Sequence, residues 1–225
     1  MVSRICSGGI AVLRSSWQSV NQLLAEVPDA VQIERCIIGR SPIAVLAPHA
    51  GSIEPMTGDL AKAIAGHLHR FYGFSGRLVR EQASLHINSL RFDEPQLHEV
   101  LRGARTAIAI HGLPGDEDAV TLIGGANRRL VEAIRSRLEA AGFAVMATST
   151  RSDSDDPRNL VNRVPEGGVH LELTQRLRDD LRGGWLRRIR FEAYVAAIRA
   201  ALAQEMNSPG PQWSEFNIQS ATPAI

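Results

Sequence analysis

Two histidines each follow a short run of apolar residues and stand close to a glycine. His49 follows the run Ile43–Ala47 in the stretch APHAG, and His111 follows the run Thr106–Ile110 in the stretch IHG. A short, wholly apolar run is typical of a central strand that is covered on both faces. Two histidines at the ends of two such strands could bind one metal ion.

Two glutamates accompany these histidines. Glu54 lies on the loop expected after His49, and Glu172 lies near the end of a third predicted strand, Val169–Leu173. Ligands of open α/β sheets collect beyond the carboxyl ends of the strands, so the four side chains are expected to converge. Two imidazoles and one carboxylate form a common catalytic zinc set, in which the metal acidifies a water molecule to a pKa of about 7.

The expected roles follow from this set. We predict that His49, Glu54 and His111 bind the metal. Glu172, outside the metal ligands, would accept a proton from the water molecule and pass it to the leaving amine. Each residue also has a structural interpretation, because a single histidine after a strand is commonly a loop hydrogen-bond partner and Glu172 could pair with Arg176. The repeated placement of histidine near glycine after a strand favours the metal site.

Strands and helices are expected to alternate along the chain. Apolar spacing predicts helices over Trp17–Val27, from a Thr57 cap to about Tyr72, and over Asn127–Ala141 and Trp185–Met206. It predicts strands over Val31–Ile38, Ile43–Ala47, Thr106–Ile110, Val120–Ile123, Phe143–Ala147 and Val169–Leu173. This alternation indicates a single three-layer α/β domain over residues 15–206, with helices on both faces of an open, mixed or largely parallel sheet. Residues 207–225 are expected to form an extended tail.

Composition argues against several classes of protein. The net charge of +1 and the pI of about 7.9 would attract neither nucleic acid nor an anionic membrane surface. No apolar stretch approaches the roughly 20 residues that span a bilayer. Cys6 and Cys36 are too few for a disulfide framework and are expected to be free thiols. Residues 5–13 make a poor signal-peptide core, which favours a cytoplasmic protein, with release by cell lysis as the alternative.

Five segments of the chain form an ordered set. They are APHAGSIEPMTGDLAKAIA, LHINSLRFDEP, IAIHG, GGANRRLVEAIRSRLEAAGF and NLVNRVPEGGVHLELTQRLR. The set covers roughly Trp17–Ala203 and resembles the poly-gamma-glutamate hydrolase family, zinc-dependent enzymes of bacteria and their phages. The resemblance implies a zinc-carboxypeptidase-like α/β fold, with one zinc ion per chain held by His49, Glu54 and His111. It also implies that Glu172, in HLEL, is the catalytic carboxylate.

The chain departs from the family pattern after the first histidine. Ala50 stands where the family usually carries glycine, which matters if this position needs a positive φ or close approach of the substrate. The remaining histidines have less support. His67 and His69 are interpreted as residues of a helix surface, and His98 and His170 receive no role.

Poly-gamma-glutamate carries a free carboxylate on every unit, so its binding requires cations that recognise carboxylates. Arginine is suited to this because its planar guanidinium can bind a carboxylate in a bidentate manner. Arg163, on the loop before the third strand, is the first candidate, with Asn162 as a further donor. Arg128 and Arg158 are additional candidates. His86, which the resemblance singles out in LHINS, could bind substrate or stabilise an oxyanion, or could be a hydrogen-bond partner in the core.

The sequence thus predicts a zinc-dependent hydrolase that cleaves the gamma-glutamyl amide bonds of poly-gamma-glutamate, with Glu172 as general base. No Gly-x-Ser-x-Gly motif occurs, so the chain lacks the nucleophile elbow of serine hydrolases. Two alternatives stay open. The same site could cleave another acidic or peptide-like amide, such as peptidoglycan or an acyl-amino acid. The chain could also be a non-catalytic module that binds carboxylates or builds a phage structure.

Overall fold

A computed structural model describes residues 17–37, 41–77, 85–115, 117–148 and 153–207. The signal-peptide interpretation of residues 5–13 and almost all of the expected tail lie outside the described residues. Among the helices in the described ranges, none combines the length and apolar composition that crossing a bilayer requires. The cytoplasmic location expected from the sequence stays a prediction.

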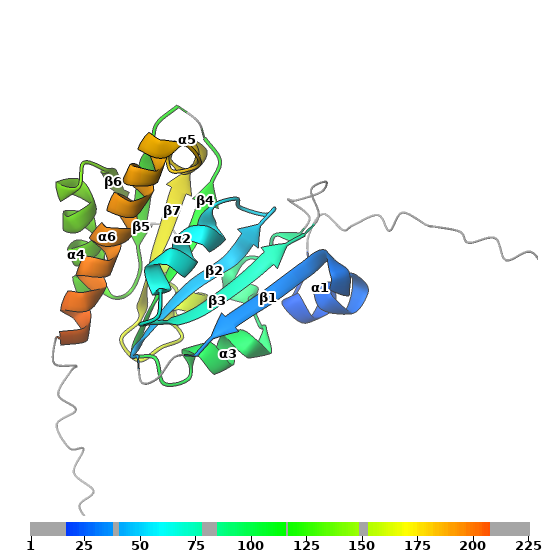
Figure 1. Ribbon diagram of the computed structural model, residues 1–225. Helices are drawn as coiled ribbons and strands as arrows, with labels where there is room; N and C mark the ends of the chain where they lie inside the picture. The colour runs from blue at the N-terminus through cyan, green and yellow to red at the C-terminus, as the bar shows by residue number, and fades with distance from the viewer. Residues whose placement is uncertain (1–16, 38–40, 78–84, 116, 149–152, 208–225) are drawn as a thin grey trace, which may run out of the picture.

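A mixed sheet of seven strands forms the centre of the molecule, in the order β1-β3-β2-β4-β7-β5-β6 (Figure 1). The strands are β1 (Val31–Cys36), β2 (Ile43–Gly51), β3 (Arg70–Gly76), β4 (Thr106–Leu113), β5 (Val120–Gly124), β6 (Ala144–Ala147) and β7 (Gly168–Thr174). The central strands β3, β2, β4 and β7 are parallel, whereas β1 and β5 pair antiparallel with β3 and β7. The prediction of an open, mixed sheet is confirmed.

Helices cover both faces of this sheet, because alternate side chains of its central strands point to opposite sides. In β2, Val45 packs in one core cluster and Leu46 in the other. The first cluster includes side chains of α2 (Thr57–Ala65), α4 (Arg128–Ala140), α5 (Gln175–Asp180) and α6 (Trp185–Asn207). The second includes side chains of α1 (Val20–Glu26) and α3 (Pro95–Leu101). The predicted three-layer architecture is therefore confirmed.

The prediction of a helix from Thr57 to about Tyr72 is wrong in its second half. Helix α2 ends at Ala65, since Gly66 adopts a positive φ of 52°, and the chain then forms β3. Phe71 packs in one core cluster and Tyr72 in the other, which is the alternation of a strand. The spacing of apolar residues continued that of the helix and hid this strand.

Side chains around this turn also differ from expectation. Leu68, which the apolar spacing of the predicted helix places on its inner face, is 66% exposed. His69, expected on a helix surface, is buried, and its Nδ1 lies 3.1 Å from the hydroxyl of Ser41. Thr57 is the first residue of α2 rather than its cap, a position that Met56 occupies with a φ of 80°.

Ala50 resolves the question raised by its departure from the family pattern. It lies inside β2 and is buried, and it is not among the residues with positive φ. Its methyl group packs against α2 where Gly58 leaves room, because a Cβ built at Gly58 would lie 2.9 Å from the Cβ of Ala50. The backbone beside His49 therefore accommodates alanine without strain.

Candidate metal centre

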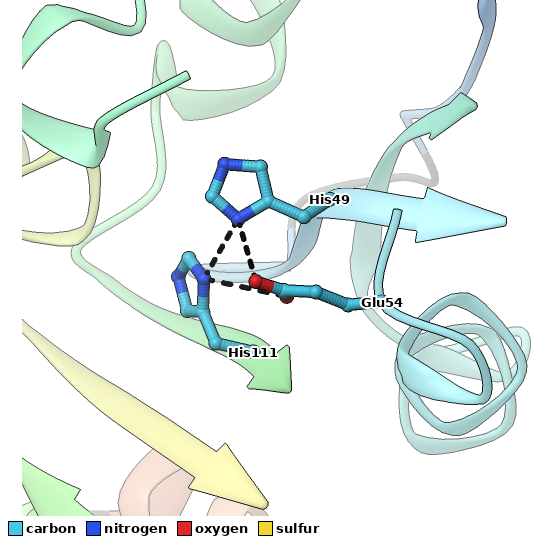
Figure 2. A group of neighbouring side chains, drawn as sticks. All are labelled: His49, Glu54 and His111. Atoms are coloured by element: carbon cyan, nitrogen blue, oxygen red, sulfur yellow. Dashed lines mark hydrogen bonds and ion pairs between the residues drawn. The ribbon is translucent and has the colours of Figure 1, made fainter. Parts of the chain in front are cut away.

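His49, Glu54 and His111 converge at the carboxyl edge of the sheet (Figure 2). The Nδ1 atoms of His49 and His111 lie 3.1 Å apart. The Glu54 carboxylate lies 3.2 Å from Nδ1 of His49 and 3.8 Å from Nδ1 of His111. With zinc bonds of about 2 Å, the ligand atoms of one tetrahedral zinc ion lie about 3.3 Å apart. The three buried side chains thus have the donor types and spacing that zinc requires.

The sequence suggested that both histidines lie just after strands. In the structure, both lie within strands. In β2, the register with β3 shifts between Ala47 and Ala50, and His49 falls within this irregularity. A bulge of this kind re-aims a side chain at the end of a strand. His111 lies in β4 and is paired in register with Glu172 of β7. Pairing of neighbouring parallel strands therefore brings the third candidate ligand, His111, next to the predicted base, Glu172.

Hydrogen bonds fix the orientation of His49. Its Nε2 lies 2.7 Å from the carbonyl oxygen of Ile87, which can only accept, so Nε2 carries the proton. The lone pair of the neutral ring is then on Nδ1, the atom that faces Glu54 and His111. Such a bond to the second ring nitrogen is the usual support of a metal-binding histidine.

The loop that carries Glu54 is also tied to its surroundings. The amide of Glu54 donates to the carbonyl of His49, and the hydroxyl of Thr57 donates to the carbonyl of Glu54, both at 2.8 Å. One carboxylate oxygen accepts a bond of 2.8 Å from the amide of Gly112. The carboxylate is therefore held in place before any cation binds.

Burial lowers the pKa of His111 well below its usual range, and the neighbouring rings of His170 and His49 lower it further. His86 stacks on His49 with ring centroids 4.0 Å apart, and its Nε2 lies 3.6 Å from the Glu54 carboxylate. Burial and His49 lower the pKa of His86 to about 4, against an opposing effect of Glu54. At neutral pH, the imidazoles of His111 and His86 are therefore neutral.

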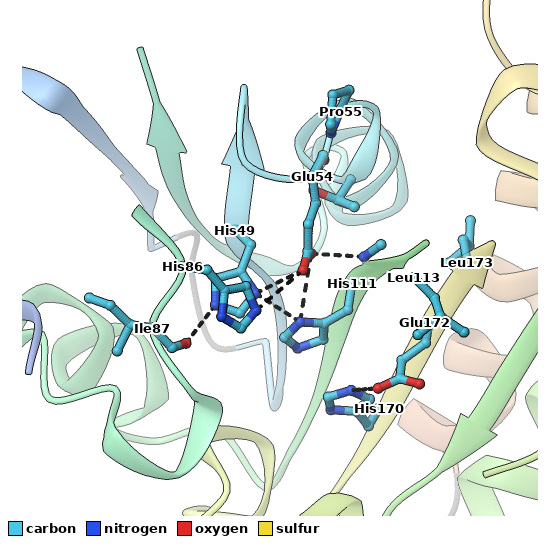
Figure 3. Close-up of polar contacts among 12 residues, drawn as sticks. His49, Glu54, Pro55, His86, Ile87, His111, Leu113, His170, Glu172 and Leu173 are labelled. Carbon is cyan, nitrogen blue, oxygen red and sulfur yellow. Dashed lines mark hydrogen bonds and ion pairs between the residues drawn. The ribbon is translucent and has the colours of Figure 1, made fainter. Parts of the chain in front are cut away.

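Glu172 has a partner that the sequence analysis missed. Nε2 of His170 lies 3.1 Å from the Glu172 carboxylate, and the His170 ring stacks on His111 with centroids 4.1 Å apart (Figure 3). This hydrogen bond is the main cause of the lowered pKa of Glu172, while burial acts in the opposite direction. Positions i and i+2 of a strand face the same side, so the motif HLE contained the signal for this pair. Glu172 does not pair with Arg176, which contacts Asp180 instead.

A cavity of about 310 Å³ joins these groups. Its lining includes the side chains His49, Glu54, His86, His111, His170 and Glu172. A cavity into which imidazoles and carboxylates converge is the arrangement of a hydrolytic site rather than of a flat binding surface.

Of the predicted substrate-binding residues, His86 lines this cavity, whereas Asn162 and the three arginines lie outside its lining. Arg163 donates to the carbonyl oxygens of four residues, Arg158, Phe92, Ser89 and Leu90. Asn162 donates to two further carbonyls, and its side-chain oxygen accepts from the amide of Gly168. Arg128 forms an exposed ion pair with Asp155, and Arg158 forms one with Asp156. Arg163 and Asn162 thus hold loops in place through the backbone.

Two imidazoles and a carboxylate, buried at the carboxyl edge of an α/β sheet, are the ligand set of a class of zinc-dependent hydrolases. Residues 17–187 match the poly-gamma-glutamate hydrolase family. The chain belongs to this family, which confirms the resemblance found from the five sequence segments.

Known relatives share the fold over most of the chain. The structure of a bacteriophage poly-gamma-glutamate hydrolase is 31% identical, with a TM-score of 0.77, and the match covers 84% of this chain and 97% of that one. The zinc-free apo structure of YNDL is 24% identical, with a TM-score of 0.73, and the match covers 84% of this chain and 98% of the YNDL chain. The SPbeta prophage-derived UPF0714 protein YoqZ of Bacillus subtilis (strain 168) is 32% identical over 142 residues, which are 62% of this chain and 51% of YoqZ. This chain therefore spans about half the length of YoqZ.

Proposed function

We propose that this protein is a zinc-dependent hydrolase that cleaves the gamma-glutamyl amide bonds of poly-gamma-glutamate. The observation that carries the proposal is the convergence of His49, Glu54 and His111, whose ligand atoms lie within 4.8 Å of one another in a chain of this family. A relative, YNDL, is known in a form specified as zinc-free, which supports zinc as the relevant ion. A bacteriophage relative named for poly-gamma-glutamate hydrolysis supports the substrate.

His49, Glu54 and His111 would hold one zinc ion per chain. When bound, the ion would supply the Lewis acidity that polarises an amide carbonyl and makes a water molecule acidic at neutral pH. One carboxylate balances only part of the charge of a divalent ion, so such a site would keep a net positive charge. A positive charge suits the attack of water on the amide of an anionic polymer.

Glu172 is the proposed general base. Its hydrogen bond from His170 favours the ionised carboxylate, which can accept a proton from the attacking water. The protonated carboxyl group then donates this proton to the nitrogen of the departing amine. No covalent intermediate is required. His86 is neutral at working pH and has one N–H group to donate to the developing oxyanion.

Carboxylate groups of the polymer need partners outside the metal centre. Arg128 and Arg158 are the two predicted arginines whose side chains are exposed, and the partner of Arg128, Asp155, adjoins Ser154 in the cavity wall. An exposed ion pair contributes little to stability, so Arg128 can exchange Asp155 for a substrate carboxylate. Arg163 and Asn162 act on substrate binding through the loops that they hold, since each binds the carbonyl of a residue that lines the cavity, Ser89 and Ser154 respectively.

The decisive experiment combines metal analysis with cleavage of the polymer. The chain, purified with excess zinc and then dialysed, is expected to retain about one zinc ion. It should shorten poly-gamma-glutamate on a gel, and a chelator should stop the reaction. Glu172→Gln should retain zinc and lose cleavage by a factor of about 10² to 10⁴. Glu192→Gln, which alters an exposed glutamate of α6, is the matched control and should cleave normally.

Two results would contradict the proposal and identify the alternatives. A chain that binds zinc but leaves the polymer intact would favour another acidic or peptide-like amide, such as peptidoglycan or an acyl-amino acid. A chain that binds no zinc would favour a non-catalytic carboxylate-binding or phage structural module.

A further inference from the structure

Arg178 is a buried arginine next to the metal centre and was not among the residues predicted from the sequence. It lies in α5, directly after β7, and is 4% exposed. It lines a second cavity of about 550 Å³, which shares Glu54, His86 and Gly112 with the first cavity. Burying a guanidinium destabilises the fold unless its N–H groups have hydrogen-bond partners. The partners of Arg178 therefore indicate its role.

The three nitrogens of Arg178 donate to the backbone of three separate segments. Nη1 donates to the carbonyl oxygen of Pro55 at 3.1 Å. Nη2 donates to that of Leu113 and Nε to that of Leu173, both at 3.3 Å. The planar guanidinium sets fixed directions for these bonds, so it also sets the relative positions of the three segments.

Each of these carbonyls belongs to a residue within two positions of a predicted site residue. The first follows Glu54, the second lies two residues after His111, and the third follows Glu172. In Figure 3, Pro55 lies beyond Glu54, and Leu113 and Leu173 lie on the side of Glu172. One guanidinium therefore connects all three chain segments that carry the ligands Glu54 and His111 and the base Glu172.

Arg178 packs against Gly112, the residue whose backbone amide donates to the Glu54 carboxylate. A Cβ built at Gly112 would lie 2.7 Å from Cζ of Arg178, so only glycine lets the guanidinium pack against this peptide. The amide of the same residue donates to the carboxylate of Glu54. Burial lowers the pKa of Arg178, and the negative charges of Glu54 and Asp179 oppose this effect. Arg178 thus touches the peptide that orients a ligand.

Arg70 offers a close structural counterpart at the opposite edge of the sheet. Its guanidinium also donates to three backbone carbonyls, those of Ser41, Val100 and Arg102. None of these residues lines the cavities at the metal centre. Arg70 and Arg178 therefore perform the same kind of bonding, but only Arg178 does so beside the candidate ligands.

We propose that Arg178 is a positioning residue of the metal centre. It fixes the spacing between the Glu54 loop and the strand ends that carry His111 and Glu172, and its loss weakens zinc binding. This inference rests on the proposed function, because it assumes that Glu54 and His111 bind zinc.

The test measures the zinc dissociation constant of folded protein by competition with a chromophoric chelator. Arg178→Gln is expected to bind zinc about 10 to 100 times more weakly than the wild type, the usual loss when support of metal ligands is removed. Arg178→Lys keeps the charge but has all its donors on one nitrogen, so it cannot match the spacing of the three carbonyls and should recover only part of the affinity. Arg70→Gln is the matched control, which should lose thermal stability and keep the zinc affinity of the wild type.

Gly112→Ala gives a second route to the same displacement. Its new methyl group pushes the guanidinium away but keeps the amide that binds Glu54. It should also weaken zinc binding. Combined with Arg178→Gln, it should weaken binding little further, because both changes disturb one interaction. This arm keeps the test decisive if Arg178→Gln does not fold.

The outcomes separate this inference from the proposed function. A wild type that binds no zinc overturns the proposed function and, with it, the role of Arg178. A wild type that binds zinc, together with unchanged affinity in Arg178→Gln or in Gly112→Ala, overturns only the role of Arg178. Equal losses of zinc affinity in Arg178→Gln and Arg70→Gln would also overturn it, since the effect would then be one of general stability.

Discussion

The two edges of the parallel strands hold buried carboxylates in different ways. At the amino edge, Glu205 of α6 is 2% exposed and lies 2.5 Å from the guanidinium of Arg129. At the carboxyl edge, Glu54 is 8% exposed, and its ion pairs within the described part of the chain are all with imidazoles, of which His49 is the nearest. A guanidinium has a permanent charge and no lone pair, whereas a neutral imidazole offers a lone pair to a cation.

The amino edge therefore contributes ion pairs to the stability of the fold, whereas the carboxyl edge holds the groups proposed to carry out the chemistry. At the amino edge, Glu166 also has two arginine partners, Arg105 and Arg129, so permanent charges join β4, β7 and two helices. At the carboxyl edge, Arg178, which lines the neighbouring cavity with Glu54, donates to backbone carbonyls. The carboxylate of Glu54 therefore keeps its capacity to bind a metal ion.

The largest expected effect follows from replacing the carboxylate at the carboxyl edge. Glu54→Gln keeps the shape of the side chain and an oxygen for the amide of Gly112, but removes the negative charge. Zinc affinity and polymer cleavage should each fall by more than about 100-fold, beyond the usual effect of residues outside the ligand shell. Competition with a chelator measures the first and gel analysis the second. Retained zinc affinity would remove Glu54 from the ligand set.

A smaller effect is expected from the partner of the base. His170→Leu removes a hydrogen bond to a charged group, worth about 1.5 to 3 kcal/mol, so cleavage should slow about tenfold or more. The pKa of Glu172 should rise, because the hydrogen bond that lowers it is lost. The acidic limb of the pH–rate profile should then move to higher pH. His98→Leu, on an exposed position of α3, is the matched control and should leave this limb unchanged.

The amino edge should respond in stability alone. Glu205→Gln leaves Arg129 without its closest carboxylate, and the half-exposed position of Arg129 limits the cost to about 1 to 3 kcal/mol. Urea unfolding of the metal-free protein measures this loss. Zinc affinity should equal that of the wild type. Weakened zinc binding in this variant would show that the two edges are coupled and would break the comparison.

The smallest effect concerns the pH dependence of stability at His69. Burial and the charge of Arg199 lower the pKa of this side chain in the folded protein. The unfolded chain therefore takes up the proton first as the pH falls below about 6.5, and the free energy of unfolding decreases from that point. Other histidines contribute as well, so the comparison is with His69→Asn. Melting temperatures at about pH 7.5 and pH 5.5 should differ less in this variant than in the wild type.

Much of the site could be predicted because local sequence patterns carry it. The apolar strands before His49 and His111 can be recognised without the structure, and strand ends in α/β sheets converge by rule. The partners of Arg163 could not be predicted in this way. They lie up to 74 positions away in the chain, and they are backbone carbonyls, which no residue type reveals. A guanidinium that binds carboxylates and one that binds carbonyls look the same in a sequence.

The strands of the fold could be predicted from the sequence where their apolar runs are continuous, but not elsewhere. Strands with continuous apolar runs were found, but β3 was hidden because Phe71 and Tyr72 extend the spacing of the preceding helix. Its first residue, Arg70, and its central Gly73 break the alternation expected of a strand. Pairing with β2 and β1 stabilises this segment as a strand, and such pairing is set by distant residues.

The contact between Ala50 and Gly58 has a consequence for the evolution of the site. The two positions share space for a single methyl group, since a second one would approach within 2.9 Å. Substitutions at these positions are therefore expected to be coupled. A relative with glycine at the position of Ala50 has room for alanine at the position of Gly58. This chain would need Ala50→Gly before it could tolerate Gly58→Ala.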